Sequence, residues 1–434
     1  MKNAASLIVR NARQVLTIPG GASGGAKTGP GMADLGVIED GAVAIVGDRI
    51  AAVGATREIR EAFTLAPGGE EIDASGCVVL PAFVDPHTHV LFAETREGEY
   101  EQRLQGRSYM EIAAAGGGIR SSVRAFHAAD DETMLAATSE RLDRLASFGT
   151  GTVEVKTGYA LDRAGELRAL RLIEELSRRH TVDLVATYLG AHEIPDAHRG
   201  DPEAYVERLV EEMIPEAAAT GIPRFCDVFC EPGVFTVDQS RRILLAGARA
   251  GLRAKIHADE IEPCGGAELA AEVGAVSADH LGRISKEGIA AIARAGVVAV
   301  LLPGTIFSLG SHRYAPAREM IASGVAVALA TDCNPGSSMT DSMPWVIALA
   351  CREMGLTPAE AIVAATRNAA AALGLAGERG SLTPGLRADL QVLSARSYAQ
   401  LPYHIGSSLV RDLVLAGRPR IRNARPVSLA LPCA

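Results

Sequence analysis

From residue 78 onward, short apolar segments rich in β-branched residues alternate with longer segments whose apolar residues recur at helical spacing. Short apolar runs bounded by turn residues are typical of strands buried in a parallel sheet. Their alternation with helices is typical of βα crossover units. Eight such runs predict an α/β protein with a closed (β/α)8 TIM-like barrel. The predicted strands are residues 78–84, 151–156, 184–189, 225–230, 252–256, 275–278, 297–302 and 325–330.

Apolar positions at helical spacing predict helices between these strands and after the last one. The predicted helices are residues 132–148, 164–177, 205–219, 237–250 and 358–372.

The two ends of the chain carry a different pattern of short β-type runs. Residues 42–46 and 50–53 flank Gly47-Asp48, which is a hairpin signal. Runs at 6–9 and 390–393 lie far apart in the sequence, and we expect them to join one small discontinuous β-sandwich domain. The expected domains are residues 1–76 and 381–434 for the small domain and 77–380 for the barrel.

Composition and charge restrict the kinds of partner. Of the 434 residues, 48% are hydrophobic and 22% charged, which is the balance of a folded protein. The net charge of −9 comes without a basic cluster, so we expect no nucleic-acid partner. No apolar run approaches the roughly 20 residues that cross a bilayer, so we expect no membrane segment. Seven scattered cysteines without a C-x-x-C pair favour the reducing cytoplasm.

Polar residues gather where the predicted strands end. Catalytic groups of such barrels lie at the carboxyl ends of the strands, so these positions are the candidates for chemistry. They are Asp85-Pro86-His87-Thr88-His89, His257-Ala258-Asp259-Glu260, Asp279-His280 and Thr331-Asp332.

A metal site is the first hypothesis for these residues. His87 and His89 are two apart, and side chains two apart on an extended segment point the same way. With His257 and Asp332 they form a His₃Asp set, which suits zinc or iron and leaves a position for water. A bound ion lowers the pKa of water from about 16 to about 7, which supplies a nucleophile at neutral pH.

Three further residues are candidates for proton transfer and charge stabilisation. Glu260 lies three residues beyond a predicted ligand and is the expected general acid and base, a role that Asp332 could share. His280 is expected to stabilise an oxyanion. His192 follows the third predicted strand in a similar way. Solvated or merely structural roles remain the alternatives for all of these side chains.

With these motifs in place, the chain resembles the amidohydrolase superfamily over nearly its whole length. The resemblance depends on Pro86-His87-Thr88-His89, His257, His280, Asp332 and the segment Gly385-Leu386-Arg387-Ala388-Asp389-Leu390. Within the superfamily the chain resembles the imidazolonepropionases. That narrower match depends on Arg103-Leu104-Gln105-Gly106, Ser108-Tyr109, residues 113–119, Val155-Lys156-Thr157-Gly158-Tyr159, Gly190-Ala191-His192, residues 255–260 and Asn334-Pro335-Gly336-Ser337-Ser338.

The resemblance implies an activity and a set of binding residues. The implied activity is hydrolysis of 4-imidazolone-5-propanoate to N-formimidoyl-L-glutamate in histidine degradation, with Zn²⁺ or Fe²⁺/Fe³⁺ bound, commonly in a homodimer. The implied ligands are His87, His89, His257 and Asp332. The implied contacts to substrate or product are Arg96, Tyr159, His192, Glu260, Asn334, Gly336 and Ser337. Arg96 makes independent sense, because a guanidinium pairs with a propanoate in two-pronged fashion.

Two departures and two alternatives complete the hypothesis. Cys333 stands where the family more usually has an aromatic residue, and strand four lacks the lysine of two-metal relatives, so we expect one metal ion per chain. Glycines 116–118 are interpreted as a lid or a close-approach loop. One alternative is another cyclic-amide hydrolase or a nucleobase-type deaminase of the same superfamily. The other is a non-catalytic binding barrel.

Overall fold

The computed structural model describes residues 2–20, 25–107, 111–112 and 116–427. The chain divides into two compact units. One comprises Met1–Val84, Arg144–Thr152 and Ser342–Ala434, and the other comprises Asp85–Asp143 and Val153–Asp341. The domain limits near residues 77 and 380 stay a prediction.

The terminal segments form one mixed sheet, as the sequence predicts. Its nine strands follow the order β17-β16-β15-β14-β5-β1-β2-β3, with β4 pairing β1. Strands β2 and β3 form the expected antiparallel hairpin across Gly47-Asp48. Side chains from both ends of the chain, such as Val9 and Leu390, share one buried core. The strands are β1 (Asn3–Leu16), β2 (Val37–Val46), β3 (Arg49–Ala55), β4 (Phe63–Asp73), β5 (Val78–Pro81), β14 (Leu390–Leu393), β15 (Val410–Leu415), β16 (Arg418–Arg422) and β17 (Arg425–Pro426).

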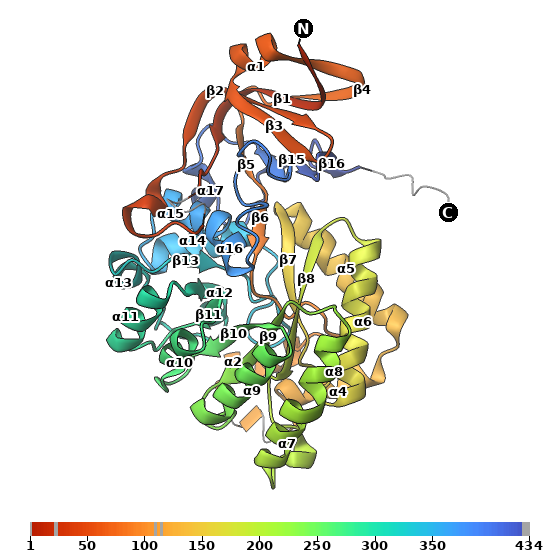
Figure 1. Cartoon of the computed structure of the whole chain (residues 1–434), viewed down its shortest axis with the longest axis vertical. Coiled ribbons are helices and arrows are strands. Elements are labelled where there is room, and N and C mark those ends of the chain that lie inside the picture. The colour runs from red at the N-terminus through yellow and green to blue at the C-terminus, as the bar shows by residue number, and fades with distance from the viewer. Residues whose placement is uncertain (1, 21–24, 108–110, 113–115, 428–434) are drawn as a thin grey trace. The chain divides into compact units, whose positions relative to one another are not determined.

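The barrel sheet has eight strands in the order β13-β12-β11-β10-β9-β8-β7-β6 (Figure 1). The registers from β8 to β13 are parallel throughout. A parallel bridge between Thr88 and Cys333 joins the segments that follow the first and last strands and brings the two edges of the sheet together. The TIM-barrel prediction is therefore confirmed. The strands are β6 (Phe83–Asp85), β7 (Thr150–Lys156), β8 (Asp183–Ala191), β9 (Phe225–Cys230), β10 (Arg253–Ala258), β11 (Ser277–His280), β12 (Val298–Leu301) and β13 (Val327–Leu329).

Helices cover the outside of the barrel strands, where their apolar faces are buried. Figure 1 shows α9 and α10 beside strands β9–β11, and α11 packs against α10. Helix α9 begins with a capping box formed by Thr236 and Gln239, which fixes its start. The helices of the barrel region are α2 (Glu97–Leu104), α4 (Ile119–Ala128), α5 (Asp131–Ser147), α6 (Arg163–Arg179), η2 (Asp196–His198), α7 (Pro202–Arg208), η3 (Leu209–Met213), α8 (Ile214–Ala219), α9 (Val237–Arg249), α10 (Gly266–Glu272), α11 (Lys286–Ala295), α12 (Pro303–Ser308) and α13 (Ala317–Ala322).

The remaining helices belong to the unit that contains both termini. Helices α14 and α15 start with serine or threonine caps, Ser342 and Thr357, followed by proline in the first turn. These helices are α1 (Thr56–Ala62), η1 (Gly29–Ala33), α14 (Met343–Glu353), α15 (Pro358–Ala364), α16 (Arg367–Ala372) and α17 (Gln400–Tyr403).

Three of the predicted elements are interrupted in the structure. The predicted strand 78–84 is two strands, because β5 pairs with β1 and β14 of the terminal sheet while β6 starts the barrel. Pro81, which has no N–H for a ladder, ends the first of them. The predicted helix 205–219 contains a π-helical turn, η3, between α7 and α8. The predicted helix 358–372 is interrupted near Thr366, which has non-helical dihedrals of φ −127° and ψ −86°.

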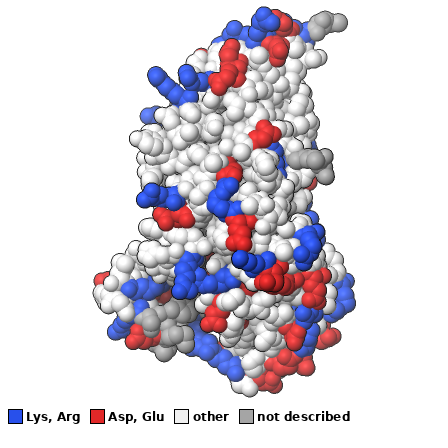
Figure 2. All heavy atoms as spheres, turned by 90° about the vertical axis from the view of Figure 1, so that its left-hand side faces the viewer, with Lys and Arg blue, Asp and Glu red and all other residues white. Residues whose placement is uncertain are grey.

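The surface carries charges of both signs. On the face in Figure 2, basic and acidic side chains lie beside one another. Elsewhere on the surface, several charged side chains form ion pairs one turn apart on a helix, such as Arg179 with Glu175. Among the residues that the structure describes, none of the helices combines the length and the apolar character needed to span a bilayer.

Candidate active site

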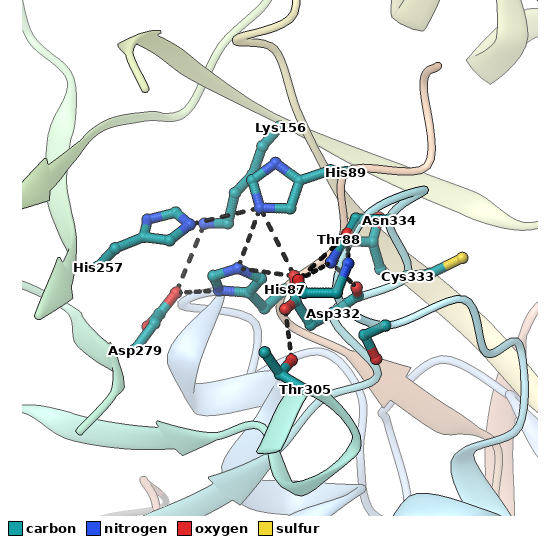
Figure 3. A network of polar contacts seen from close by, with 12 residues as sticks. His87, Thr88, His89, Lys156, His257, Asp279, Thr305, Asp332, Cys333 and Asn334 are labelled. Carbon is teal, nitrogen blue, oxygen red and sulfur yellow. Dashed lines mark hydrogen bonds and ion pairs between the residues drawn. The ribbon is translucent and has the colours of Figure 1, made fainter. Parts of the chain in front are cut away.

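The four predicted metal ligands converge at the carboxyl ends of the barrel strands (Figure 3). The Nε2 atoms of His87 and His89 are 3.3 Å apart, and those of His89 and His257 are 3.4 Å apart. Asp332 Oδ1 lies 3.5 Å from His87 Nε2 and 3.7 Å from His89 Nε2. Four ligand atoms at about 2.1 Å from one ion in tetrahedral geometry are about 3.4 Å apart. The spacing of these side chains therefore fits a metal ion.

The protonation of the histidines also fits a cation. Burial, followed by the neighbouring positive groups, lowers the pKa values of His87 and His89 well below the usual value, so both rings are neutral. His87 Nδ1 is 2.6 Å from Asp279 Oδ2, and His257 Nδ1 is 3.1 Å from Asp227 Oδ2. Each carboxylate accepts a hydrogen bond from the ring Nδ1–H, which leaves the Nε2 lone pair facing the centre. Lone pairs that face one another at 3.3 Å are suited to a shared cation.

A buried network of opposite charges lies next to the ligands. Lys156 Nζ is 2.7 Å from Asp227 Oδ2, 3.1 Å from Glu154 Oε2 and 3.5 Å from Asp279 Oδ2. Lys255 Nζ donates to Glu154 Oε2 at 2.8 Å and to the Pro86 carbonyl at 2.8 Å. Glu154 and Asp279 lie close enough to His87 to form a second metal-binding group. The two ammonium groups already pair with these carboxylates.

Glu260 and His280 lie together beside the ligands. His280 Nδ1 is 3.5 Å from Glu260 Oε2, and the His280 ring is 5.3 Å from the rings of His87 and His257. Burial, and then the negative charges of Asp332 and Glu231, raise the pKa of Glu260 to about 8. Burial lowers the pKa of His280 well below its usual value. Glu260 can therefore exchange a proton near neutral pH, with the neutral His280 ring beside it.

The loop that carries Glu260 is held by carboxylates rather than by regular structure. Glu231, at the end of β9, accepts hydrogen bonds from the backbone N–H groups of Glu260, Ile261 and Glu262 at 3.1, 3.2 and 2.7 Å. The Asp259 side chain accepts further backbone N–H groups, from residues 264 to 267. These bonds fix the course of the loop between β10 and α10.

Three residues of the site have left-handed backbone conformations. The φ angles are 49° at Asp259, 75° at His280 and 52° at Asp332. Such a conformation costs a residue with a Cβ roughly 1–2 kcal/mol. It turns the chain sharply after β10, β11 and β13, and the side chains of His280 and Asp332 face the ligand cluster. Strain of this kind is concentrated at functional sites.

His192 and Tyr159 lie on one side of the ligands. The His192 ring is stacked on that of His89, with centroids 4.8 Å apart and an interplanar angle of 15°. His192 Nδ1 bonds the Gly158 carbonyl at 3.0 Å, and burial lowers its pKa to about 3. The Tyr159 ring is 5.5 Å from His192 and 6.0 Å from His89. Both aromatic side chains thus lie next to the predicted ligand His89.

Arg96 lies against the loop after β13. Its Nε and Nη2 atoms donate to Glu99 Oε2 at 3.0 and 2.8 Å. A Cβ added to Gly336 would be only 2.4 Å from Arg96 Nη1, so the guanidinium packs on the bare backbone of this glycine. Glu99 Oε1 also accepts the Gly118 N–H at 2.9 Å and so connects Arg96 to the glycine loop.

Asn334 shapes the same loop. Its Oδ1 accepts the N–H groups of Gly336 and Ser337 at 2.8 and 2.7 Å, and its Nδ2 donates to the Asp332 carbonyl at 2.7 Å. Asn334 therefore links the Arg96 region to a metal-ligand position. Cys333 points away from the histidines (Figure 3), and burial raises the pKa of its thiol well above the usual value.

The structure thus brings together His87, His89, His257, Asp332, Glu260, His280, His192 and Tyr159, and separately Arg96, Asn334, Gly336 and Ser337. Sequence reasoning gave no role to Asp227, Asp279, Lys156 or Glu99. Charged residues inside the apolar strands, such as Asp227 between Cys226 and Val228, were the available signal. The motif residues 108–110 and 113–115 lie outside the described residues.

A sequence profile of the amidohydrolase family matches residues 78–418, so the chain belongs to that family. Solved structures agree with it in fold. An adenosine deaminase from Xanthomonas campestris with bound zinc has a TM-score of 0.70 at 20% identity, covering 99% of this chain and 96% of that one. Atrazine chlorohydrolase TrzN from Arthrobacter aurescens TC1, complexed with zinc, has a TM-score of 0.66 at 17% identity, covering 97% and 96%.

Within this family, the chain belongs to the imidazolonepropionases. It is 49% identical over 421 residues to the imidazolonepropionase of Geobacillus kaustophilus, covering 96% of this chain and 99% of that protein. It is 48% identical over 413 residues to that of Symbiobacterium thermophilum, covering 95% and 96%. It is 49% identical over 411 residues to that of Parabacteroides distasonis, covering 95% and 98%.

Proposed function

We propose that the protein is a metal-dependent hydrolase that opens the ring of 4-imidazolone-5-propanoate and forms N-formimidoyl-L-glutamate in histidine degradation. The observation that carries the proposal is the convergence of His87, His89, His257 and Asp332 beside the Glu260–His280 pair. The name shared by relatives that are nearly half identical supplies the substrate. A non-catalytic barrel would have no need of this complete set of ligands and acid–base groups.

The chain's own residues divide the reaction between them. Glu260 takes the proton of the attacking water and passes it to the ring nitrogen as the C–N bond breaks, and Asp332 can share the first of these steps. A pKa near neutrality suits a group that must both accept and donate a proton. His280 stabilises the negative charge that develops on the carbonyl oxygen. A divalent ion held by the His₃Asp set supplies, when bound, the Lewis acidity that activates water and polarises the carbonyl.

Substrate binding is assigned to the two clusters around this centre. Tyr159 and His192 offer aromatic faces and hydrogen-bonding groups to the imidazolone ring. Arg96, on the Gly336 backbone, pairs with the propanoate group, while Asn334 and Ser337 shape that subsite. Arg96 favours this substrate over that of a nucleobase-type deaminase, because a nucleobase has no carboxylate for Arg96 to bind.

We also propose one Zn²⁺ or iron ion per chain, because Lys156 and Lys255 already pair with the other buried carboxylates. Three imidazoles and a carboxylate accept either metal. A cytoplasmic homodimer is proposed from the unpaired cysteines and the family resemblance.

The test is anaerobic incubation of purified, metal-analysed protein with freshly prepared 4-imidazolone-5-propanoate, following ring absorbance and formimidoyl-glutamate. The expected result is chelator-sensitive turnover with about one metal ion per chain. In the same assay, Glu260→Gln is expected to lower turnover. Its matched control is Glu262→Gln, because Glu262 lies in the same loop with its side chain exposed. Fully metallated protein that leaves the imidazolone intact but hydrolyses another cyclic amide, or releases ammonia from a nucleobase, would overturn the substrate.

A further inference from the structure

Lys156 is a fully buried cation that the reaction itself does not use. It lies at the end of β7 with none of its side chain exposed, and its Nζ contacts three carboxylates at 2.7, 3.1 and 3.5 Å. Burial alone would lower its pKa, but Asp227, Glu154 and Asp279 raise the pKa above the usual value, so the side chain is an ammonium ion. Removal of one member of such a buried group leaves an uncompensated charge, so each partner depends on the others.

Two of its partners are the carboxylates that orient metal ligands. Asp227 holds His257, and Asp279 holds His87, each through the ring Nδ1. Lys156 is therefore the one side chain, among the described residues, bonded to both of these carboxylates at 3.5 Å or less. Figure 3 shows the Lys156 amine joined to Asp279, which also contacts His87.

The charges of this region balance around a single ion. Counted as ionised, Glu154, Asp227, Asp279 and Asp332 carry four negative charges, and Lys156 with Lys255 carries two positive charges. One divalent ion brings this sum to zero. The two lysines thus offset half of the negative charge, and the remaining charge is that which one divalent ion neutralises.

We propose that Lys156 is a positioning residue of the metal centre: it fixes Asp227 and Asp279 together, and through them the Nε2 atoms of His257 and His87. The inference rests on the proposed metal site. Carboxylates behind metal-bound histidines typically change metal affinity about 10–100-fold when they are altered. Removal of their common anchor is expected to have an effect of that size.

The direction of the change in metal affinity distinguishes a positioning role of Lys156 from simple charge repulsion. If Lys156 only repelled the metal ion, Lys156→Met would bind metal more tightly. If Lys156 positions the carboxylates, the same variant binds metal more weakly despite the lost repulsion. Lys156→Arg keeps the charge, but a planar guanidinium cannot reproduce the three contacts of a compact ammonium, so it too is expected to weaken binding.

The experiment measures Zn²⁺ affinity by competition with a chromophoric chelator in the full-length protein, together with the absorption spectrum of the Co²⁺-substituted form. Lys255→Met is the matched control, since it removes an equal buried charge whose amine is 3.8 Å from Asp279 and bonds Glu154 instead. We expect about 10–100-fold weaker Zn²⁺ binding in Lys156→Met and Lys156→Arg, altered Co²⁺ spectra, and a smaller change in the control.

Unchanged or tighter binding in Lys156→Met, or equal weakening in Lys255→Met, would overturn the role of Lys156. If Lys156→Met does not fold, Lys156→Arg decides alone, and wild-type affinity in that variant refutes the inference. Wild-type protein that binds no Zn²⁺ in the same titration would instead refute the metal site, so the two failures are distinguishable.

Discussion

Replacement of Gly336 by alanine tests the proposed carboxylate subsite. The added Cβ would lie 2.4 Å from Arg96 Nη1 and 2.8 Å from its Cζ, whereas ordinary contact begins at 3.4 Å. The guanidinium must therefore retreat by about 1 Å, the difference between 2.4 and 3.4 Å. It is not free to do so, because Glu99 holds it by bonds of 2.8 and 3.0 Å. The backbone itself tolerates alanine, since φ at Gly336 lies outside the left-handed region.

A displacement of about 1 Å at a substrate-positioning group can cost about 100-fold in rate. We expect kcat/KM for the imidazolone to fall about 10–100-fold, mainly through KM, which corresponds to about 1.4–2.7 kcal/mol. Gly98→Ala is the control, since Gly98 lies two residues from Arg96 with nothing within 4 Å of an added Cβ. Initial rates under anaerobic conditions give kcat and KM for both variants. If Gly336→Ala and Gly98→Ala have kcat/KM values within twofold of each other, Arg96 does not bind the substrate as proposed.

Three further predictions concern the centre itself. Glu260→Gln with metal retained should lower kcat about 10²–10⁴-fold, whereas Glu262→Gln should not. Wild-type turnover in Glu260→Gln would show that Glu260 takes no part in proton transfer. Chelation should abolish turnover and lower the thermal midpoint, because an ion at ~1,000 times its Kd adds about 4 kcal/mol; an unchanged midpoint would contradict this. In metal-free protein, Glu260 has a raised pKa of about 8 and so keeps a proton that the unfolded chain releases near the ordinary glutamate pKa of 4.5. Its stabilising effect is therefore present at low pH and lost as pH rises through 8. Denaturant titrations at pH 5.5 and 8.5 should show wild type losing stability relative to Glu260→Gln over that range, and parallel curves would refute it.

The barrel was predictable because strands buried on both faces give continuous apolar runs. Residues 225–230 were predicted within the bounds that the structure has for β9. The first strand was not, because residues 78–84 are apolar throughout and pattern alone cannot divide one run between two sheets. The division at Pro81 depends on pairing with β14, which is more than 300 residues away along the chain.

The candidate ligands were predictable for a local reason. His87 and His89 follow a strand at a spacing of two, and His257 ends another. The supporting groups were hidden by long-range pairing: Lys156 and Asp227 are 71 residues apart, and each alone is an isolated charge in a strand. Glu99 was equally hidden, because its helix has no periodic apolar face, and none of its residues is buried. The left-handed turn at His280 has no signal in its residue type.

The bonds from Glu231 to the backbone of residues 260–262 have a consequence for how this enzyme can diversify. Barrel enzymes acquire new specificities by exchanging loops on a constant framework, which requires each loop to hold its own shape. The loop that carries Glu260 takes its shape from the end of a neighbouring strand. Without Glu231, this loop would lose its conformation in another barrel. The loop that carries Glu260 and the segment after β9 that carries Glu231 must therefore be exchanged together in a design that alters the substrate.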